Sequence, residues 1–258
     1  MPDQTLLLTT AQAGVTTLTL NNPAARNALS TAMLTALEDA LGAIAADDAV
    51  RVLVIAANGP GFCAGHDLRE VRTFDGPARA RLFAQCSRFM QRLTTLPVPV
   101  IARVHGIATA AGCQLVATCD LALASDTARF AVSGINVGLF CSTPMVALSR
   151  VVPRKAAMEM LLTGDFIDAP EAARLGLINR CVPEADLDAA VLALATKLAG
   201  KSRSAVALGK PAFYHQVGLS LADAYAHTAE VMVRNMDEHD ANEGIDAFVQ
   251  KRAPVWTD

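Results

Sequence analysis

Three short apolar runs, separated by stretches of helical periodicity, constrain the fold of this chain more than any other feature. The runs occupy residues 51–57, 100–104 and 121–124. A strand that is apolar along its whole length is buried on both faces, as in a parallel sheet covered by helices. Apolar residues also recur at helical spacing after Ser30, a suitable N-cap, and around residues 79–96. The pattern therefore predicts an α/β fold.

The two ends of the chain differ from this middle part. Alternating residues at 6–9 and 15–20 predict a β-hairpin. Beyond residue 143 the pattern is mostly helical, with one late strand expected at residues 177–182. Proline or serine marks the expected helix starts there, at Pro153, Pro170, Pro183, Ser202 and Ser220. We expect an α/β core over residues 1–200 and a helical region over residues 201–258.

Composition excludes several classes of protein. Hydrophobic residues make up 52% and charged residues 18% of the chain, which is incompatible with intrinsic disorder. The formal net charge is −3 without a basic block, so nucleic acid is not an expected partner. The longest uncharged run, residues 130–149, contains Gly, Asn, Ser and Pro residues. We interpret this run as a buried, loop-rich segment rather than a membrane span.

The cysteines and the N-terminal residues bear on the cellular compartment. Six cysteines occur without a CxxC pair, which predicts reduced, buried thiols. Residues 1–10 contain neither the basic region and cleavage site of a secretion signal nor an Arg-rich amphipathic stretch. Together these features predict a cytoplasmic protein.

The sequence lacks the signatures of several common cofactor and hydrolase sites. Gly59, Gly61 and Gly65 have the spacing GxGxxxG, which differs from the dinucleotide fingerprint. No GxSxG, Walker A or HExxH motif occurs, and the His and Cys residues lack the spacing of a zinc site. We therefore expect no metal and no separate cofactor.

Two segments of small residues, 61–68 and 105–115, each follow an apolar run. Small residues allow backbone N–H groups to approach a ligand closely. The second segment runs into an expected helix, whose N-terminal dipole favours negative charge on an oxygen atom. Two N–H donors, one from each segment, are the requirement for an oxyanion hole.

Six ordered segments of the chain resemble the crotonase (enoyl-CoA hydratase/isomerase) superfamily. They span nearly the whole sequence: 21–29 (NNPAARNAL), 62–68 (FCAGHDL), 106–120, 157–164 (AMEMLLTG), 172–178 (AARLGLI) and 243–252 (EGIDAFVQKR). The resemblance implies a spiral of ββα units with a helical C-terminal trimerisation region, assembled as a homotrimer or as a homohexamer, a dimer of trimers.

The resemblance also implies a substrate and the residues that bind it. The substrate is an acyl-CoA thioester, so that coenzyme A is part of the substrate. The backbone N–H groups of His66 and Ala111 are expected to bind the thioester carbonyl oxygen. The residues expected near coenzyme A are Ala25, Arg26, Ala64, His66, Asp67, Leu68 and Arg69, with Phe248 and Lys251 contributed by a neighbouring subunit. Lys251 is expected to face the 3′-phosphate.

The sequence departs from the family at the two glutamates that hydratases use as acid and base. Gln114 and Gly134 occupy these positions, and neither exchanges a proton near neutral pH. Positioned acid and base groups typically contribute ~10²–10⁴ in rate, so fast conventional hydration is not expected. The segment 134–144 most resembles the subgroup of enoyl-CoA hydratase domain-containing protein 3, which also lacks both glutamates.

Other polar groups near these positions are weaker candidates for chemistry. Ser142 occupies the position of an aspartate that other members use, and Cys141 precedes it. A buried thiol is usually inert, and no base for Ser142 is evident in the sequence. The imidazole of His66 is a further acid–base candidate, because its ordinary pKa is near neutral. Asp67 is expected to cap a helix, and Asp120 to make structural hydrogen bonds.

Three functions remain open at this point. The first is an acyl-CoA-processing enzyme of the hydratase/isomerase type, a lyase or isomerase with atypical or weak hydratase activity. The second is a non-catalytic acyl-CoA-binding protein, which the missing glutamates favour. The third is a hydrolase of the same fold acting on a thioester or a β-diketone. The two small-residue segments favour the enzyme, because a pure scaffold does not need an oxyanion hole.

Overall fold

From the third to the eighth strand, successive strands alternate between two sheets in the computed structural model, which describes residues 5–257. The larger sheet has the order β1 (Leu7–Gln12), β2 (Val15–Leu20), β3 (Val52–Ala57), β5 (Val100–Val104), β7 (Leu121–Ser125) and β10 (Arg180–Val182). The smaller sheet has the order β4 (Gly61–Cys63), β6 (Ile107–Thr109), β8 (Arg129–Ala131) and β9 (Ile167–Asp168). From β3 to β8, each pass of the chain adds one strand to each sheet before a helical segment follows, which is the predicted ββα spiral.

The strand directions agree with the sequence pattern. β1 and β2 form the predicted antiparallel hairpin. β3, β5 and β7 are parallel neighbours, and their apolar runs are mostly buried. The late strand is shorter than predicted, because the N–H groups of Leu177 and Ile178 donate instead to the carbonyl oxygen of Ala172.

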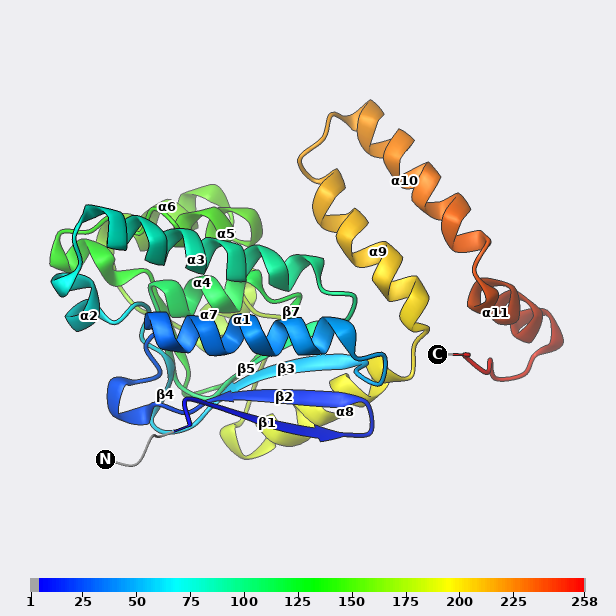
Figure 1. Cartoon of the computed structure of the whole chain (residues 1–258), viewed down its shortest axis with the longest axis horizontal. Coiled ribbons are helices and arrows are strands. Elements are labelled where there is room, and N and C mark those ends of the chain that lie inside the picture. The colour runs from blue at the N-terminus through cyan, green and yellow to red at the C-terminus, as the bar shows by residue number, and fades with distance from the viewer. Residues whose placement is uncertain (1–4, 258) are drawn as a thin grey trace.

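Helices cover both faces of the larger sheet, as the apolar runs require. On one face lie α1 (Thr31–Ala46), α3 (Gly76–Thr95) and α4 (Ala111–Thr118), and on the opposite face lies α8 (Leu187–Ala199) (Figure 1). Leu53 and Ile55 of β3 pack in the main core with α1, whereas Val52 and Val54 pack against Leu187 of α8. Successive side chains of β3 point to opposite faces of the sheet, so they pack alternately in two separate cores.

Polar caps fix several helix starts where the sequence predicts them. The Ser30 hydroxyl accepts a hydrogen bond from the Met33 N–H at 3.2 Å, before α1. Ser202 caps α9 (Arg203–Gln216) and Ser220 caps α10 (Leu221–Met236) in the same way. Asp67 caps α2 (Leu68–Thr73) by accepting from the N–H groups of Arg69 and Glu70. This confirms the expected capping role of Asp67.

The remaining helical segments are η1 (Pro23–Ala25), η2 (Ser133–Val137), α5 (Pro144–Val151), α6 (Arg154–Thr163), α7 (Ala169–Arg174) and η3 (Glu184–Asp186). Of these, α7 contacts β8 and β9 of the smaller sheet, whereas η3 contacts β7 of the larger sheet.

The uncharged run at residues 130–149 is loop-rich, but its interpretation as a buried segment is wrong. Val137 is 61% exposed and Leu139 is 53% exposed. Only the beginning of the run and a few later positions, such as Cys141 and Leu148, are buried. The apolar side chains of η2 and the following loop therefore form a rim rather than a core. Among residues 5–257, no helix has the length and apolar character needed to cross a membrane.

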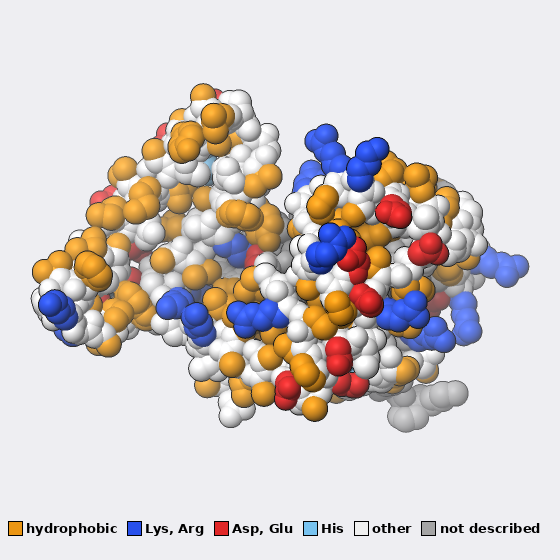
Figure 2. All heavy atoms as spheres, turned by 180° about the vertical axis from the view of Figure 1, so that it is seen from behind, with side chains coloured by type: hydrophobic (Ala, Val, Ile, Leu, Met, Phe, Trp, Pro, Cys, Tyr) orange, Lys and Arg blue, Asp and Glu red, His pale blue; other side chains and the backbone are white. Residues whose placement is uncertain are grey.

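Three C-terminal helices, α9, α10 and α11 (His239–Gln250), project from the rest of the molecule (Figure 1). We refer to residues 203–250 as the C-terminal arm. Apolar side chains, orange in Figure 2, gather along this arm. The exposed large apolar residues of the arm include Phe213, Leu221, Tyr225, Val233, Phe248 and Val249. Large apolar surfaces of this kind typically mark protein–protein contacts.

A buried ion pair connects the C-terminal arm to the α/β core. The Lys210 ammonium of α9 lies 2.7 Å from a carboxylate oxygen of Asp120, which precedes β7. Lys210 also donates to the carbonyl oxygens of Leu93 and Val98. The second carboxylate oxygen accepts from the Tyr214 hydroxyl at 2.8 Å. These bonds confirm that Asp120 has a structural role.

Candidate active site

The two small-residue segments meet at one cavity of about 410 Å³. β4 pairs with β6 in parallel, which brings the end of segment 61–68 beside segment 105–115. The cavity lies between these segments, the helices α2 and α3, and the rim at residues 133–144. None of the described residues that line it is Asp, Glu, Lys or Arg. The cavity is therefore apolar, with polar groups at only a few positions.

Close packing of glycines holds the two segments together. A Cβ atom on Gly112 would lie 2.1 Å from the carbonyl oxygen of Cys63, so only glycine fits there. Gly65 has a φ of +88°, and a Cβ atom on it would lie 3.1 Å from the backbone nitrogen of Ala111. These contacts bring the chain on either side of Gly65 against the first turn of α4.

Two residues at this junction have backbone N–H groups without a hydrogen-bond partner among the described residues. Within residues 5–257, no acceptor is paired with the N–H of His66 or with that of Ala111. Ala111 is the first residue of α4, where N–H groups have no acceptor inside the helix. The preceding Ala110 has a φ of +52°, a region that costs a non-glycine residue about 1–3 kcal/mol. Such strain often accompanies functional sites.

The His66 side chain also lies at the cavity. Its Nδ1 atom is 3.2 Å from the carbonyl oxygen of Leu29, and its ring meets the Phe83 ring edge-on at 5.2 Å. Its Nε2 atom is buried and has no partner within the described residues. Burial lowers the pKa of His66, although the Leu29 carbonyl and the Glu70 carboxylate oppose this shift.

Comparison with known proteins assigns the family. A sequence model described as enoyl-CoA hydratase/isomerase matches residues 10–258. The chain belongs to this family. A mouse mitochondrial relative, enoyl-CoA hydratase domain-containing protein 3, is 49% identical over 253 residues, covering 98% of this chain and 84% of the relative.

Solved structures agree with this assignment. An enoyl-CoA hydratase from Mycobacterium smegmatis matches with a TM-score of 0.96 and 55% identity, covering 99% of this chain and 100% of that chain. The human enoyl-CoA hydratase domain-containing protein 3 matches with a TM-score of 0.94 and 48% identity, over 98% of this chain and 100% of that chain. The expected crotonase fold, and the resemblance to this subgroup, are therefore confirmed.

The predicted cytoplasmic location is wrong by the same comparison. Five relatives, from mouse, rat, Xenopus laevis, human and Danio rerio, are named as mitochondrial proteins. The six cysteines are free, as predicted, and five of them are buried. Free thiols are usual in reducing compartments, and they do not distinguish one reducing compartment from another.

The structure separates Gln114 and Gly134, the two residues that the resemblance places at the positions of the family's glutamates. Gly134 lines the cavity, whereas Gln114 is not among the lining residues. Gln114 is 5% exposed, and its side-chain oxygen has no partner among the described residues. At Gly134, a Cβ atom would lie 2.6 Å from the Leu139 carbonyl oxygen and 2.8 Å from the Cys141 sulfur. The rim loop thus fills the space that a side chain at residue 134 needs.

We expect Gly134→Glu not to create hydratase activity. The new side chain would push against the Leu139 backbone, and overpacking of this kind typically costs ~1–3 kcal/mol. Crotonyl-CoA hydration, followed by loss of enone absorbance, should stay at the wild-type level while the unfolding midpoint falls. Gly76→Glu is the control, because Gly76 has open space around it in the first turn of α3. A gain of hydration in the Gly134 variant would contradict this account.

Cys141 and Ser142 both line the cavity, but their surroundings do not activate them. Burial raises the pKa of the Cys141 thiol. The Ser142 hydroxyl donates to the carbonyl oxygen of Phe140 at 3.3 Å. Within residues 5–257, no basic side chain forms a hydrogen bond with either group, so both remain weak candidates for nucleophilic chemistry.

Most residues expected near coenzyme A are adjacent in space. The Ala64 N–H donates to the Arg26 carbonyl oxygen at 3.0 Å, so the loop at Ala25 and Arg26 lies against the segment that continues into α2. This segment contains the remaining expected residues: His66, Asp67, Leu68 and Arg69. Within residues 5–257, no cluster of three or more His, Cys, Asp or Glu side chains is arranged to hold a metal ion.

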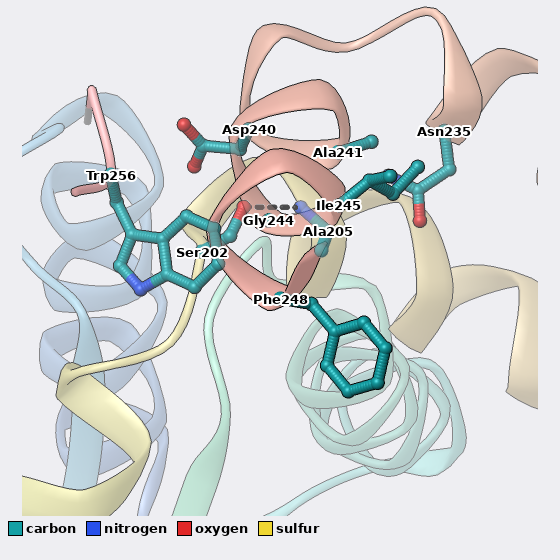
Figure 3. Close-up of a pocket in the computed structure, with 9 residues that line it drawn as sticks. All are labelled: Ser202, Ala205, Asn235, Asp240, Ala241, Gly244, Ile245, Phe248 and Trp256. Atoms are coloured by element: carbon teal, nitrogen blue, oxygen red, sulfur yellow. Dashed lines mark hydrogen bonds between the residues drawn. The ribbon is translucent and has the colours of Figure 1, made fainter. Parts of the chain in front are cut away.

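Phe248 and Lys251 lie elsewhere, in the C-terminal arm and at the end of α11. Phe248 is 84% exposed and lines a separate cavity of about 340 Å³, which also contains Ile245 and Trp256 (Figure 3). A single chain therefore does not bring these two residues to the main cavity, and the expected role requires a neighbouring subunit.

Two residues of the site were missed by the sequence analysis. Asn27 is fully buried, and its side chain accepts from the Asn22 N–H and donates to the carbonyl oxygens of Asn58 and Gly61. These bonds fix the loop that precedes α1. Phe83 lines the cavity although the adjacent Leu82 belongs to the buried stripe of α3. An apolar residue beside such a stripe is the signal that could have identified it.

Proposed function

We propose that this protein is an enzyme that processes acyl-CoA thioesters by stabilising a thioester enolate. The thioester carbonyl oxygen binds the backbone N–H groups of His66 and Ala111, which are the two donors of an oxyanion hole. The observation that supports this proposal most directly is that both N–H groups lack a hydrogen-bond partner among the described residues. Both residues also line the same apolar cavity. Preorganised donors of this kind are usually the largest single contribution to catalysis of such steps.

Hydration of an enoyl-CoA is expected to be weak or absent. Adding water across a double bond needs one group to activate the water and one to protonate carbon. The lining residues include no carboxylate, and a substituent at Gly134 has no room. The non-catalytic acyl-CoA-binding protein is the second candidate, and it is favoured by this same lack of carboxylates.

Coenzyme A is proposed as part of the substrate, with no other cofactor. The Ala25–Arg26 loop and residues 64–69 form the part of the site that one chain supplies. Phe248 and Lys251 are proposed to reach the site of a neighbouring subunit. The exposed apolar side chains of the C-terminal arm support assembly as a homotrimer or homohexamer, because contact between subunits would cover them.

The test combines binding with a search for products. Crotonyl-CoA and a longer trans-2-enoyl-CoA are titrated calorimetrically and then incubated with the protein, and the products are separated by mass spectrometry. We expect saturable binding and turnover of an acyl-CoA, with slow hydration at most. Saturable binding without any product in a thioester panel would favour the binding protein. Release of a free acid would favour the hydrolase.

A further inference from the structure

Small and large side chains are unevenly distributed over the lining of the main cavity. The two segments that carry the proposed oxyanion donors contribute small residues to it: Ala64, Ala110 and Ala111. The large apolar side chains come instead from α2, α3 and the rim: Leu68, Val71, Phe83, Val137, Leu139 and Phe140. A thioester carbonyl therefore has room beside the donors, and a group attached to it would lie against apolar side chains.

The rim part of this lining is held in place by its own backbone. The Leu139 N–H donates to the carbonyl oxygen of Gly134 at 2.9 Å, and the Gly138 N–H donates to that of Ile135 at 3.1 Å. Gly138 has a φ of +77°, a conformation that glycine adopts without strain. The turn presents Leu139 at the cavity, where the side chain is still 53% exposed. An apolar ligand in the cavity would cover this surface and gain free energy from doing so.

The described lining offers no partner to a charged group. It contains no Asp, Glu, Lys or Arg, and its polar side chains are hydroxyls, the Cys141 thiol and the His66 imidazole. Burial lowers the pKa of His66, so the imidazole carries no fixed positive charge near neutral pH. Coenzyme A carries phosphate groups, and an unpaired anion is costly to bury. The apolar walls therefore suit the acyl chain of a thioester, and only a chain without a charged end.

The cavity is larger than a four-carbon acyl group needs. Its volume is about 410 Å³. A water-sized group takes about 30 Å³ in a liquid, so the cavity holds about thirteen such groups. The thioester itself takes about three of them, which leaves room for about ten carbon atoms. A crotonyl group would leave most of the apolar wall in contact with water.

We propose that this site takes acyl-CoA thioesters with an uncharged, apolar acyl chain of about eight to twelve carbons, and that Leu139 is a residue that determines this preference. The proposal rests on the proposed function, because the bound carbonyl oxygen is what directs the chain into the cavity. Phe83 forms the wall contributed by α3, and its ring lies 5.2 Å from the imidazole of His66. Leu139 belongs to the rim, so the two side chains come from different parts of the fold.

Affinity should rise with chain length until the cavity is full. Each fully buried methylene group improves binding by about fourfold, and a partly exposed one by less. From butyryl-CoA to decanoyl-CoA we expect the dissociation constant to fall by about 10²-fold. Palmitoyl-CoA should bind within a few fold of decanoyl-CoA, because its last carbons extend beyond the cavity. All these thioesters share coenzyme A, so its contacts cancel in the comparison.

The decisive experiment is calorimetric titration of wild type, Leu139→Ala and Leu162→Ala with butyryl-CoA and decanoyl-CoA. Leu162 is the matched control, since it is 59% exposed on α6 and does not line the cavity. We expect Leu139→Ala to reduce the preference for decanoyl-CoA over butyryl-CoA by about tenfold. Its affinity for butyryl-CoA should stay within a few fold of wild type. Leu162→Ala should keep the full preference.

A carboxylate at the end of the chain tests the apolar requirement separately. Hexanoyl-CoA and adipyl-CoA have six-carbon chains and differ only at the last carbon, which is a methyl group in one and a carboxylate in the other. A chain of this length ends inside the cavity, where no described Lys or Arg side chain lies. Adipyl-CoA should therefore bind at least about tenfold more weakly than hexanoyl-CoA. Equal or tighter binding of adipyl-CoA would contradict the proposal.

The results distinguish this proposal from the function on which it rests. If no acyl-CoA binds, both fail. Binding that does not change from butyryl-CoA to decanoyl-CoA leaves the acyl-CoA function standing and overturns the chain preference, and so does a further large gain with palmitoyl-CoA. A chain preference that is unchanged in folded Leu139→Ala overturns the role of Leu139. The wild-type series depends on no variant, and thermal unfolding confirms that both variants are folded.

Discussion

Replacing Ala111 by proline should lower the turnover of an acyl-CoA by about 10²–10³-fold, the usual effect of removing one oxyanion donor. Proline has no N–H, and its substitution deletes the donor that begins α4. The first position of a helix usually tolerates proline, because its N–H has no acceptor inside the helix. Here the preceding Ala110 has φ +52° and ψ −120°, outside the extended region that a residue before proline prefers, so the fold of the variant must be checked. The measurement is kcat/KM for whichever thioester the product search finds to be turned over, together with acyl-CoA affinity.

Ala111→Gly is the matched control for this variant. Glycine keeps the N–H and removes only the methyl group, so turnover should remain within a few fold of wild type. Thermal unfolding of both variants reports whether the strained backbone at Ala110 has been disturbed. Wild-type turnover in a folded Ala111→Pro protein would show that the carbonyl oxygen is bound elsewhere. Equal losses in both variants would assign the effect to packing rather than to the donor.

The larger sheet could be predicted from the sequence because its physical signal is strong. The runs at residues 51–57, 100–104 and 121–124 are apolar except for Arg51 and Arg103, and the structure places them as parallel neighbours. The smaller sheet was harder to predict, since β4, β6 and β8 are each three residues long. A strand of that length shows too few alternations to be told from a loop.

The rim at residues 133–144 was misjudged because apolar composition reports burial only on average. Leu139 and Phe140 are exposed or partly exposed beside the cavity, where an apolar surface suits an apolar ligand. The hydrogen bond from His66 to Leu29 was also beyond the sequence, since 37 positions separate the partners. By contrast, the glycines at 65 and 112 mark where two backbones touch, which the small-residue segments predicted.

The largest effect on stability is expected at the ion pair between Lys210 and Asp120. Breaking a buried pair by removing one partner typically costs ~3–5 kcal/mol, because the other charge stays buried. The side chains of Lys210 and Asp120 are 8% and 16% exposed, and burial lowers the pKa of Lys210 while the Asp120 carboxylate opposes this shift. Lys210→Met should therefore lower the free energy of unfolding by about that amount, measured by denaturant titration at fixed protein concentration.

Comparison with an exposed ion pair tests whether burial causes the expected loss of stability in Lys210→Met. Arg174 and Glu171 form a two-bonded ion pair on the surface of α7, and Arg174→Met should change stability only slightly. Adding Asp120→Asn to Lys210→Met should recover part of the loss, since no buried charge remains unpaired. Recovery is only partial, because asparagine has one side-chain oxygen, whereas the Tyr214 hydroxyl and the Val100 N–H donate to different oxygens of Asp120. If Lys210→Met costs no more than Arg174→Met, the C-terminal arm is held by its apolar contacts and not by this pair.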